Sequence, residues 1–310
     1  MSYFIFGGSG FIGTHLIALI DNIYPGTKIY NLDIVKNNHE GKSTYINCDV
    51  RSEINIDISV TSEDVIFNFA AVHRTPGHPD QAYFETNIRG AENVCAFAEK
   101  FGIKKIVFTS SIAPYGAAED LKTEETLPTP NTPYGISKLV AEKIHTIWQA
   151  KKSNERQLTI VRPGVVFGKG ENGNFTRLYW GIRGGKFFYP GRKDTIKACI
   201  YVKELVRFML YRLENHNEGV ELYNCTYEPA FTIEQIVTMK KATGVQRTVV
   251  EVPGSLLMTV ARIVGSLGGK ALGICPARVK KLMISTNICG KKLADSGYKF
   301  HYTFEEAIKD

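Results

Sequence analysis

The sequence contains few cysteines, and none of them stands in a pattern typical of a metal site or of a disulfide framework. Its six cysteines lie far apart, without a CxxC pair or a Cys/His spacing that suits zinc. This distribution excludes a disulfide-rich secreted module, predicts no metal site and favours a reducing, cytoplasmic setting. The chain opens with MSYFIFGGSG, which we expect to form a strand almost at once, so we expect no targeting segment.

Long hydrophobic runs and blocks of like charge are also missing. The most apolar late stretch, residues 255–274, contains Arg262, Lys270 and four glycines, which is too polar and broken for a membrane span. We expect a core or lid helix there, with a helix at a membrane interface as the alternative. The net charge of +7 comes from scattered Lys and Arg residues, which suits anionic ligands but does not indicate nucleic-acid binding.

Short β-rich segments alternate with helical segments from the N-terminus onward. The strand-like segments are YFIF, KIYNLD, VIFNFAA and KKIVFTSS. Longer helical segments separate them. This alternation predicts an α/β fold of the Rossmann type, a doubly wound parallel sheet. After Gly164 the elements become shorter, so we expect residues 1–164 to bind a dinucleotide. We expect residues 165–310 to form mainly a smaller α+β substrate-binding unit, with some segments returning to the first.

The segment YFIFGGSGFIG places glycines between the first strand and the first helix. Gly7, Gly10 and Gly13 have the spacing that allows a tight turn and a close approach of backbone N–H groups to a pyrophosphate. Asp33 ends the next strand, twenty residues after Gly13, where a carboxylate accepts hydrogen bonds from the adenosine ribose. An acid at this position repels a 2′-phosphate, so the pattern predicts NAD as the cofactor.

Tyr134 and Lys138 are four residues apart in a predicted helix and therefore share a face. Bringing a phenol to neutral pKa takes about 4 kcal/mol, and a cation at ~4 Å supplies energy of that order. We interpret the pair as a general base tuned by an adjacent cation; the alternative is a packed tyrosine and a solvated lysine. The strand KKIVFTSS brings Ser110 and Ser111 to the carboxyl edge of the sheet, where such sheets bind ligands, and this favours the catalytic interpretation.

In this combination and order, these motifs resemble the extended short-chain dehydrogenase/reductase family, the NAD-dependent epimerases and dehydratases, and within it the sugar-nucleotide epimerases and reductases. The resemblance covers essentially the whole chain and is densest up to about Gly168. It implies a catalytic triad of Ser111, Tyr134 and Lys138. It implies a cofactor site made of Gly7, Gly10, Phe11, Ile12, Gly13, Asp33, Asp49, Val50, Phe69, Ala70, Ala71, Asn87, Tyr134, Lys138 and Pro163.

The resemblance also assigns substrate contacts, to Ser111, Asn174, Lys197 and Arg278. Two departures from the family pattern discriminate between its activities. Ile112 and Ala113 stand where the dehydratases carry an Asp-Glu pair, which argues against a dehydratase. Val165 replaces an asparagine that contacts substrate in many sugar-nucleotide enzymes.

The activity that the resemblance implies is C4 epimerisation of a UDP-hexose or UDP-N-acetylhexosamine through a 4-keto intermediate. The alternatives are an NAD(P)H-dependent reductase of a 4-keto (deoxy)sugar nucleotide, a dehydrogenase or epimerase of a hydroxysteroid or lipid-linked sugar, and a non-catalytic dinucleotide sensor. The implied partners are a nucleotide-diphosphate sugar and a second copy of the chain, packed through residues 80–100 and the Tyr134 helix. We expect no integral membrane segment and no nucleic acid.

Overall fold

A seven-stranded sheet forms the centre of the computed structural model, which describes residues 1–310 apart from 37–40, 75–76, 217–218, 243, 245–247 and 265–282. Its strand order is β12-β7-β5-β4-β1-β2-β3, and every neighbouring pair is parallel. The strands are β1 (Tyr3–Phe6), β2 (Ile29–Asp33), β3 (Thr44–Asn47), β4 (Val65–Asn68), β5 (Lys105–Thr109), β7 (Gln157–Pro163) and β12 (Val220–Cys225).

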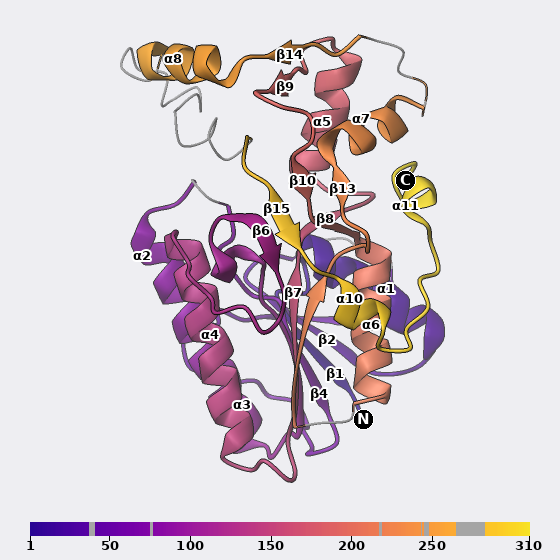
Figure 1. The fold of residues 1–310 in the computed structure, drawn as a ribbon. Coiled ribbons are helices and arrows are strands. Elements are labelled where there is room, and N and C mark those ends of the chain that lie inside the picture. Colours follow the sequence, from indigo (N-terminus) through magenta and orange to yellow (C-terminus); the bar gives the residue numbers. More distant parts are fainter. Residues whose placement is uncertain (37–40, 75–76, 217–218, 243, 245–247, 265–282) are drawn as a thin grey trace.

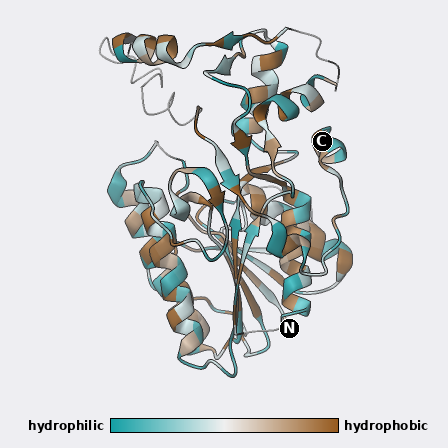
Figure 2. Ribbon diagram, viewed as in Figure 1, coloured by the Kyte–Doolittle hydropathy of each residue, from teal (hydrophilic) through white to brown (hydrophobic). Residues whose placement is uncertain are grey.

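Helices cover both faces of this sheet (Figure 1). They are α1 (Phe11–Ile23) and α6 (Val202–Glu214) on one face, and α3 (Arg89–Lys100) and α4 (Pro133–Ala150) on the other. Successive side chains of β1 alternate between two buried clusters: Tyr3 and Ile5 pack toward α1 and α6, whereas Phe4 and Phe6 pack toward α3. A strand buried on both faces is apolar at every position, and Figure 2 shows the resulting hydrophobic sheet interior. The predicted doubly wound fold is confirmed.

A smaller unit lies beyond the carboxyl end of this sheet (Figure 1). It contains a four-stranded sheet of order β13-β10-β15-β6 and two strand pairs, β11–β8 and β14–β9. The strands are β6 (Ala118–Lys122), β8 (Val165–Phe167), β9 (Tyr189–Pro190), β10 (Ile196–Lys197), β11 (Cys199–Tyr201), β13 (Phe231–Thr232), β14 (Glu251–Val252) and β15 (Thr286–Ile288). The helices of the later chain are α5 (Asn174–Arg183), α7 (Ile233–Lys241), α8 (Gly254–Val264), α10 (Lys291–Ala294) and α11 (Phe304–Ala307).

Two late elements pack with the early part of the chain. β12 extends the main sheet through its parallel pairing with β7, and α6 packs beside α1 through Leu205 and Phe208. The boundary at residues 164/165 itself stays a prediction. Within the described residues, the model contains no helix that is both long and apolar enough to cross a membrane.

Candidate active site

The glycine loop between β1 and α1 lies at the carboxyl edge of the sheet. Gly7 has a φ of +76°, and a Cβ at this position would stand 2.7 Å from the backbone nitrogen of Ala70. Only glycine therefore allows this turn to lie against the segment that follows β4. Gly10 is the N-cap of α1, and no side chain caps that end of the helix. Because the glycines carry no side chains and the helix start has no side-chain cap, the loop forms a cradle that fits the pyrophosphate of a dinucleotide.

Asp33 lies at the end of β2, directly beside this loop. Its Oδ2 accepts a hydrogen bond from the backbone N–H of Ser9 at 3.0 Å, and its Oδ1 accepts one from Val35 at 3.1 Å. The carboxylate is thus fixed next to the glycine loop, at the place where a dinucleotide-binding fold positions the adenosine ribose.

Asp49 and Val50, which the family resemblance assigns to the cofactor, already have protein contacts. The Asp49 carboxylate forms a 2.6 Å ion pair with Arg51, and hydrogen bonds from Arg51 lower the pKa of Asp49. Val50 is buried, and its carbonyl accepts a 2.7 Å hydrogen bond from the Asn93 side chain. These contacts fix the segment that follows β3.

Asn87 is buried in a π-helical turn, Phe84–Ile88, that precedes α3. Its amide accepts a 2.8 Å hydrogen bond from the Val72 N–H and donates to the Val72 carbonyl at 3.1 Å. It also donates to Ser137 on α4 at 2.8 Å. Asn87 therefore holds the segment after β4, which carries the predicted cofactor residues Phe69, Ala70 and Ala71, against the helix of the Tyr–Lys pair.

The start of α4 brings Tyr134 to Ser111. Thr132 caps the helix by accepting a 3.1 Å hydrogen bond from the Gly135 N–H. A Cβ on Gly135 would stand 2.6 Å from the Ala113 carbonyl oxygen, so only glycine lets the helix start approach the turn after Ser111 so closely. Burial raises the pKa of Tyr134, while a side-chain hydrogen bond with Ser111 opposes part of that rise. Ser111 therefore lies near enough to Tyr134 to affect the ionisation of its phenol, as the sequence predicts.

Lys138 lies one turn further along α4 and is 2% exposed. Its ammonium lies over the ring of Phe108, 4.2 Å from the ring centroid. Burial lowers the pKa of Lys138 to about 7, and the charge of Glu142 works against this shift. We expected the lysine cation to lower the pKa of Tyr134; in the structure the burial of Tyr134 dominates, and the net shift of its pKa is upward.

Of the remaining predicted residues, Pro163 is assigned to the cofactor, whereas Asn174, Lys197 and Arg278 are assigned to the substrate. Pro163 ends β7, and its carbonyl accepts a 3.3 Å hydrogen bond from Ile112. Asn174 is exposed at the first position of α5. The Lys197 ammonium donates a 2.7 Å hydrogen bond to the Ile284 carbonyl. Arg278 lies outside the described residues.

Glu142 is a buried acid that the sequence reasoning missed. It is four residues after Lys138 and eight after Tyr134 on the same helix, so its position on the same face could have been read from the spacing. It accepts hydrogen bonds from Arg162 at 2.8 and 2.6 Å and another from Ser110. The face of α4 therefore carries a phenol, an ammonium and a carboxylate in succession, the last neutralised by an arginine of β7.

Comparison with known proteins identifies the family of the chain. The family described as the NAD dependent epimerase/dehydratase family matches residues 3–226. The N-acetyl-alpha-D-glucosaminyl-diphospho-ditrans,octacis-undecaprenol 4-epimerase of Escherichia coli O157:H7 is 33% identical over 308 residues, which are 98% of this chain and 92% of that protein. The 3beta-hydroxysteroid-dehydrogenase/decarboxylase isoform 1 of Arabidopsis thaliana is 24% identical, covering 98% of this chain and 77% of its own.

Two solved structures have the same fold over nearly the full chain. The UDP-N-acetylglucosamine 4-epimerase from Bacillus cereus superposes with a TM-score of 0.73 at 19% identity, covering 100% of this chain and 97% of that one. MoeE5, in complex with UDP-glucuronic acid and NAD, superposes with a TM-score of 0.75 at 20% identity, covering 99% and 96%.

Proposed function

The chain belongs to the NAD-dependent epimerase/dehydratase family, and from this premise we propose that it epimerises C4 of a hexose or N-acetylhexosamine attached to a diphosphate carrier. Family membership confirms the resemblance found in the sequence and agrees with the expected cofactor, NAD. The observation that supports the reaction best is the closeness of Ser111 to Tyr134, which lowers the pKa of the phenol against burial, with Lys138 on the same helix face.

The proposed reaction uses Tyr134 as the group that takes the proton from the sugar 4-hydroxyl and later returns it. The Ser111 hydroxyl hydrogen-bonds the sugar 4-oxygen and the phenolate oxygen of Tyr134. It thereby stabilises the phenolate. The cradle of the glycine loop would hold NAD, which would supply reversible hydride transfer at C4. Lys138, one turn further along the same helix face, stabilises the charge that develops on Tyr134 in this proposal. Because the 4-keto sugar can turn before it is reduced again, the configuration at C4 is inverted without net oxidation.

The carrier of the sugar is the second part of the proposal. The sequence predicts a uridine diphosphate, and the UDP-sugar epimerases share the fold. A polyprenol diphosphate is favoured by the relative that is 33% identical over nearly its full length, which acts on N-acetylglucosamine linked to undecaprenol diphosphate. We therefore propose N-acetylglucosamine as the sugar and a polyprenol diphosphate as the first carrier to test, with UDP as the second.

The experiment supplies N-acetylglucosamine on each carrier to the purified protein with NAD and follows the sugar H4 signal by NMR together with NADH absorbance. A new C4 epimer without net NADH supports the epimerase. Consumption of NAD(P)H with a supplied 4-keto sugar, with no epimer formed from any sugar, would instead identify a reductase. Ser111→Ala should slow epimerisation by about 10²-fold or more, because one stabilising hydroxyl is lost.

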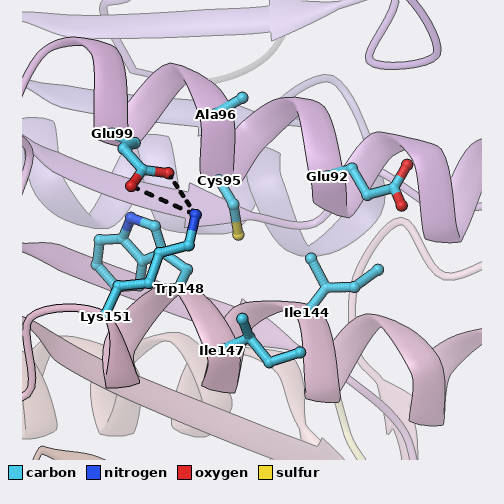
Figure 3. Close-up of a pocket in the computed structure, with 8 residues that line it drawn as sticks. All are labelled: Glu92, Cys95, Ala96, Glu99, Ile144, Ile147, Trp148 and Lys151. Atoms are coloured by element: carbon cyan, nitrogen blue, oxygen red, sulfur yellow. Dashed lines mark hydrogen bonds and ion pairs between the residues drawn. The ribbon is translucent and has the colours of Figure 1, made fainter.

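We propose a homodimer as the working form, packed through the outer faces of α3 and α4. Figure 3 shows a shallow hollow between these helices that is lined by apolar and charged side chains. Its lining residues are Glu92, Cys95, Ala96, Glu99, Ile144, Ile147, Trp148 and Lys151. Ile147 is 60% exposed there, which favours burial by another surface. Light scattering should report a dimer that Ile147→Asp disrupts and Leu127→Asp, at another exposed apolar position, does not.

We also propose a cytoplasmic setting. Cys48, Cys95, Cys199, Cys225 and Cys289 are free thiols, which supports a reducing compartment.

A further inference from the structure

The outer side of α8 carries an uncovered apolar stripe. Leu256, Val260 and Ile263 are 54%, 45% and 55% exposed, and their spacing of four and three residues places them on one face of the helix. Ala261 on the opposite side is 1% exposed, so α8 packs on the protein through its other face. Figure 1 places α8 at the end of the smaller unit farthest from the main sheet.

Exposed cations stand on α8 and on α5 of the same unit, and one exposed acid, Glu251 of β14, precedes α8. On α8 itself, Arg262 is exposed next to Ile263. The sequence 174–186, which contains α5, has the basic residues Arg177, Arg183 and Lys186 and no acidic residue, and all three are exposed. The strand β9 that follows α5 pairs with β14, which leads into α8, so both helices belong to the same outer part of the molecule.

An exposed tryptophan accompanies these cations. Trp180 on α5 is 58% exposed, and the Arg183 guanidinium lies 5.3 Å from its ring centroid. Tryptophan and arginine side chains are the residues that favour the boundary between lipid headgroups and hydrocarbon. A protein partner would be recognised by an apolar groove or by paired charges. A short apolar helix face in the same unit as exposed arginines, a lysine and a tryptophan instead matches an anionic lipid surface.

We propose that α8 docks the protein onto a bilayer containing anionic lipids, with Leu256, Val260 and Ile263 entering the headgroup region. The cations of α5 and Arg262 add electrostatic attraction. The inference rests on the proposed function for its purpose: a sugar on a polyprenol diphosphate lies at that bilayer surface. The catalytic residues stand at the carboxyl edge of the main sheet, which faces the smaller unit (Figure 1), so docking holds the enzyme at the surface where its substrate is anchored.

The test is cosedimentation of the full chain, without substrate, with vesicles of phosphatidylcholine alone or with about a third phosphatidylglycerol. We expect binding to the anionic vesicles that weakens with salt and falls by about tenfold or more in Leu256→Ser/Val260→Ser/Ile263→Ser. The matched control, Ile23→Ser/Leu121→Ser/Leu127→Ser, removes apolar side chains that are exposed elsewhere and should bind as the unchanged protein does.

A second readout keeps the proposal testable should the triple variant fold poorly. Leu256→Trp should show blue-shifted emission on anionic vesicles. The docking proposal is overturned if the unchanged protein does not bind anionic vesicles, or if the triple variant binds them equally well. It is also overturned if the triple substitution leaves vesicle binding unchanged but alters the oligomeric state. Tyr134→Phe should bind vesicles normally, because docking does not use the catalytic phenol. If the unchanged protein binds vesicles but epimerises no sugar, the proposed function is overturned and the docking surface stays in place.

Discussion

Arg162 and Glu142 form a buried ion pair joined by two hydrogen bonds, of 2.8 Å from Nε and 2.6 Å from Nη2. The pair links β7 to α4 one turn beyond Lys138. Both side chains are nearly inaccessible to water, so neither charge is solvated if the other is removed. The pair therefore fixes the helix that carries Tyr134 and Lys138, and the charge of Glu142 raises the pKa of Lys138 against the effect of burial.

Removing the carboxylate charge should destabilise the protein strongly. Glu142→Gln leaves the Arg162 guanidinium buried without a counter-charge, which we expect to lower the free energy of unfolding by about 3 kcal/mol. Urea unfolding measures this value. Asp295→Asn is the matched control, because Asp295 pairs with Lys291 at the exposed surface, where such a pair contributes about 0–1 kcal/mol. Equal effects of the two substitutions would refute a structural role for the buried pair.

The lowered pKa of Lys138 predicts a specific pH dependence of stability. Burial moves this pKa from 10.5 to about 7, so between these values the unfolded chain binds a proton that the folded chain does not. The cost of burying the ammonium is complete below pH ~7 and disappears as pH rises toward the ordinary pKa of lysine. From pH ~7 to ~9 the nucleotide-free protein should gain roughly 2 kcal/mol relative to Lys138→Met.

Chemical denaturation of both proteins at the two pH values measures this difference. Lys143→Met, which removes an exposed lysine of the same helix, serves as the control and should show no comparable change. A stability difference between Lys138→Met and the unchanged protein that does not vary with pH would mean that Lys138 has an ordinary pKa.

The turn at Gly7 should not tolerate a side chain. Gly7→Ala combines a φ of +76° with a Cβ only 2.7 Å from the Ala70 nitrogen. Gly26→Ala has a similar φ of +87° but open space around the new Cβ, so it isolates the backbone cost, about 1 kcal/mol. We expect Gly7→Ala to lose more stability than the control and to bind NAD more weakly, as measured by thermal unfolding and calorimetry. Equal losses of stability in Gly7→Ala and Gly26→Ala would show that the glycine loop can move to accommodate the new Cβ without strain.

Asp33 should determine the choice between the two nicotinamide cofactors. Asp33→Ala removes the carboxylate beside the glycine loop, and we expect NAD affinity to fall by about tenfold and the preference for NAD over NADP to shrink. Calorimetric titration with each cofactor gives both values. If Asp33→Ala binds NAD as tightly as the unchanged protein does, the adenosine ribose does not bind at Asp33.

The parts of the site that depend on local spacing could be predicted from the sequence. The glycines at Gly7, Gly10 and Gly13 define their own turn, and the alternation of strands and helices places Asp33 beside them. The helical period alone puts Tyr134 and Lys138 on one face. None of these features requires knowledge of a distant contact.

The parts that depend on tertiary packing could not be predicted. The position of Lys138 over Phe108 joins two elements far apart in sequence, and the net rise in the pKa of Tyr134 follows from burial, which spacing does not specify. Lys197 was expected at the substrate diphosphate, but its donation to the Ile284 carbonyl depends on a residue 87 positions away. The two- and three-residue strands of the smaller unit pair with strands that are distant in the sequence. They are also too short to show the alternation of apolar and polar residues that predicts a strand.

The most direct test of the central claim is the NMR assay of C4 epimerisation, with N-acetylglucosamine supplied on polyprenol diphosphate and on UDP in parallel. The account predicts that a new C4 epimer forms with NAD present, without net NADH, and that Tyr134→Phe loses at least about 10²-fold of this rate while it still binds NAD. No epimer from either carrier, or full activity of Tyr134→Phe, would contradict it.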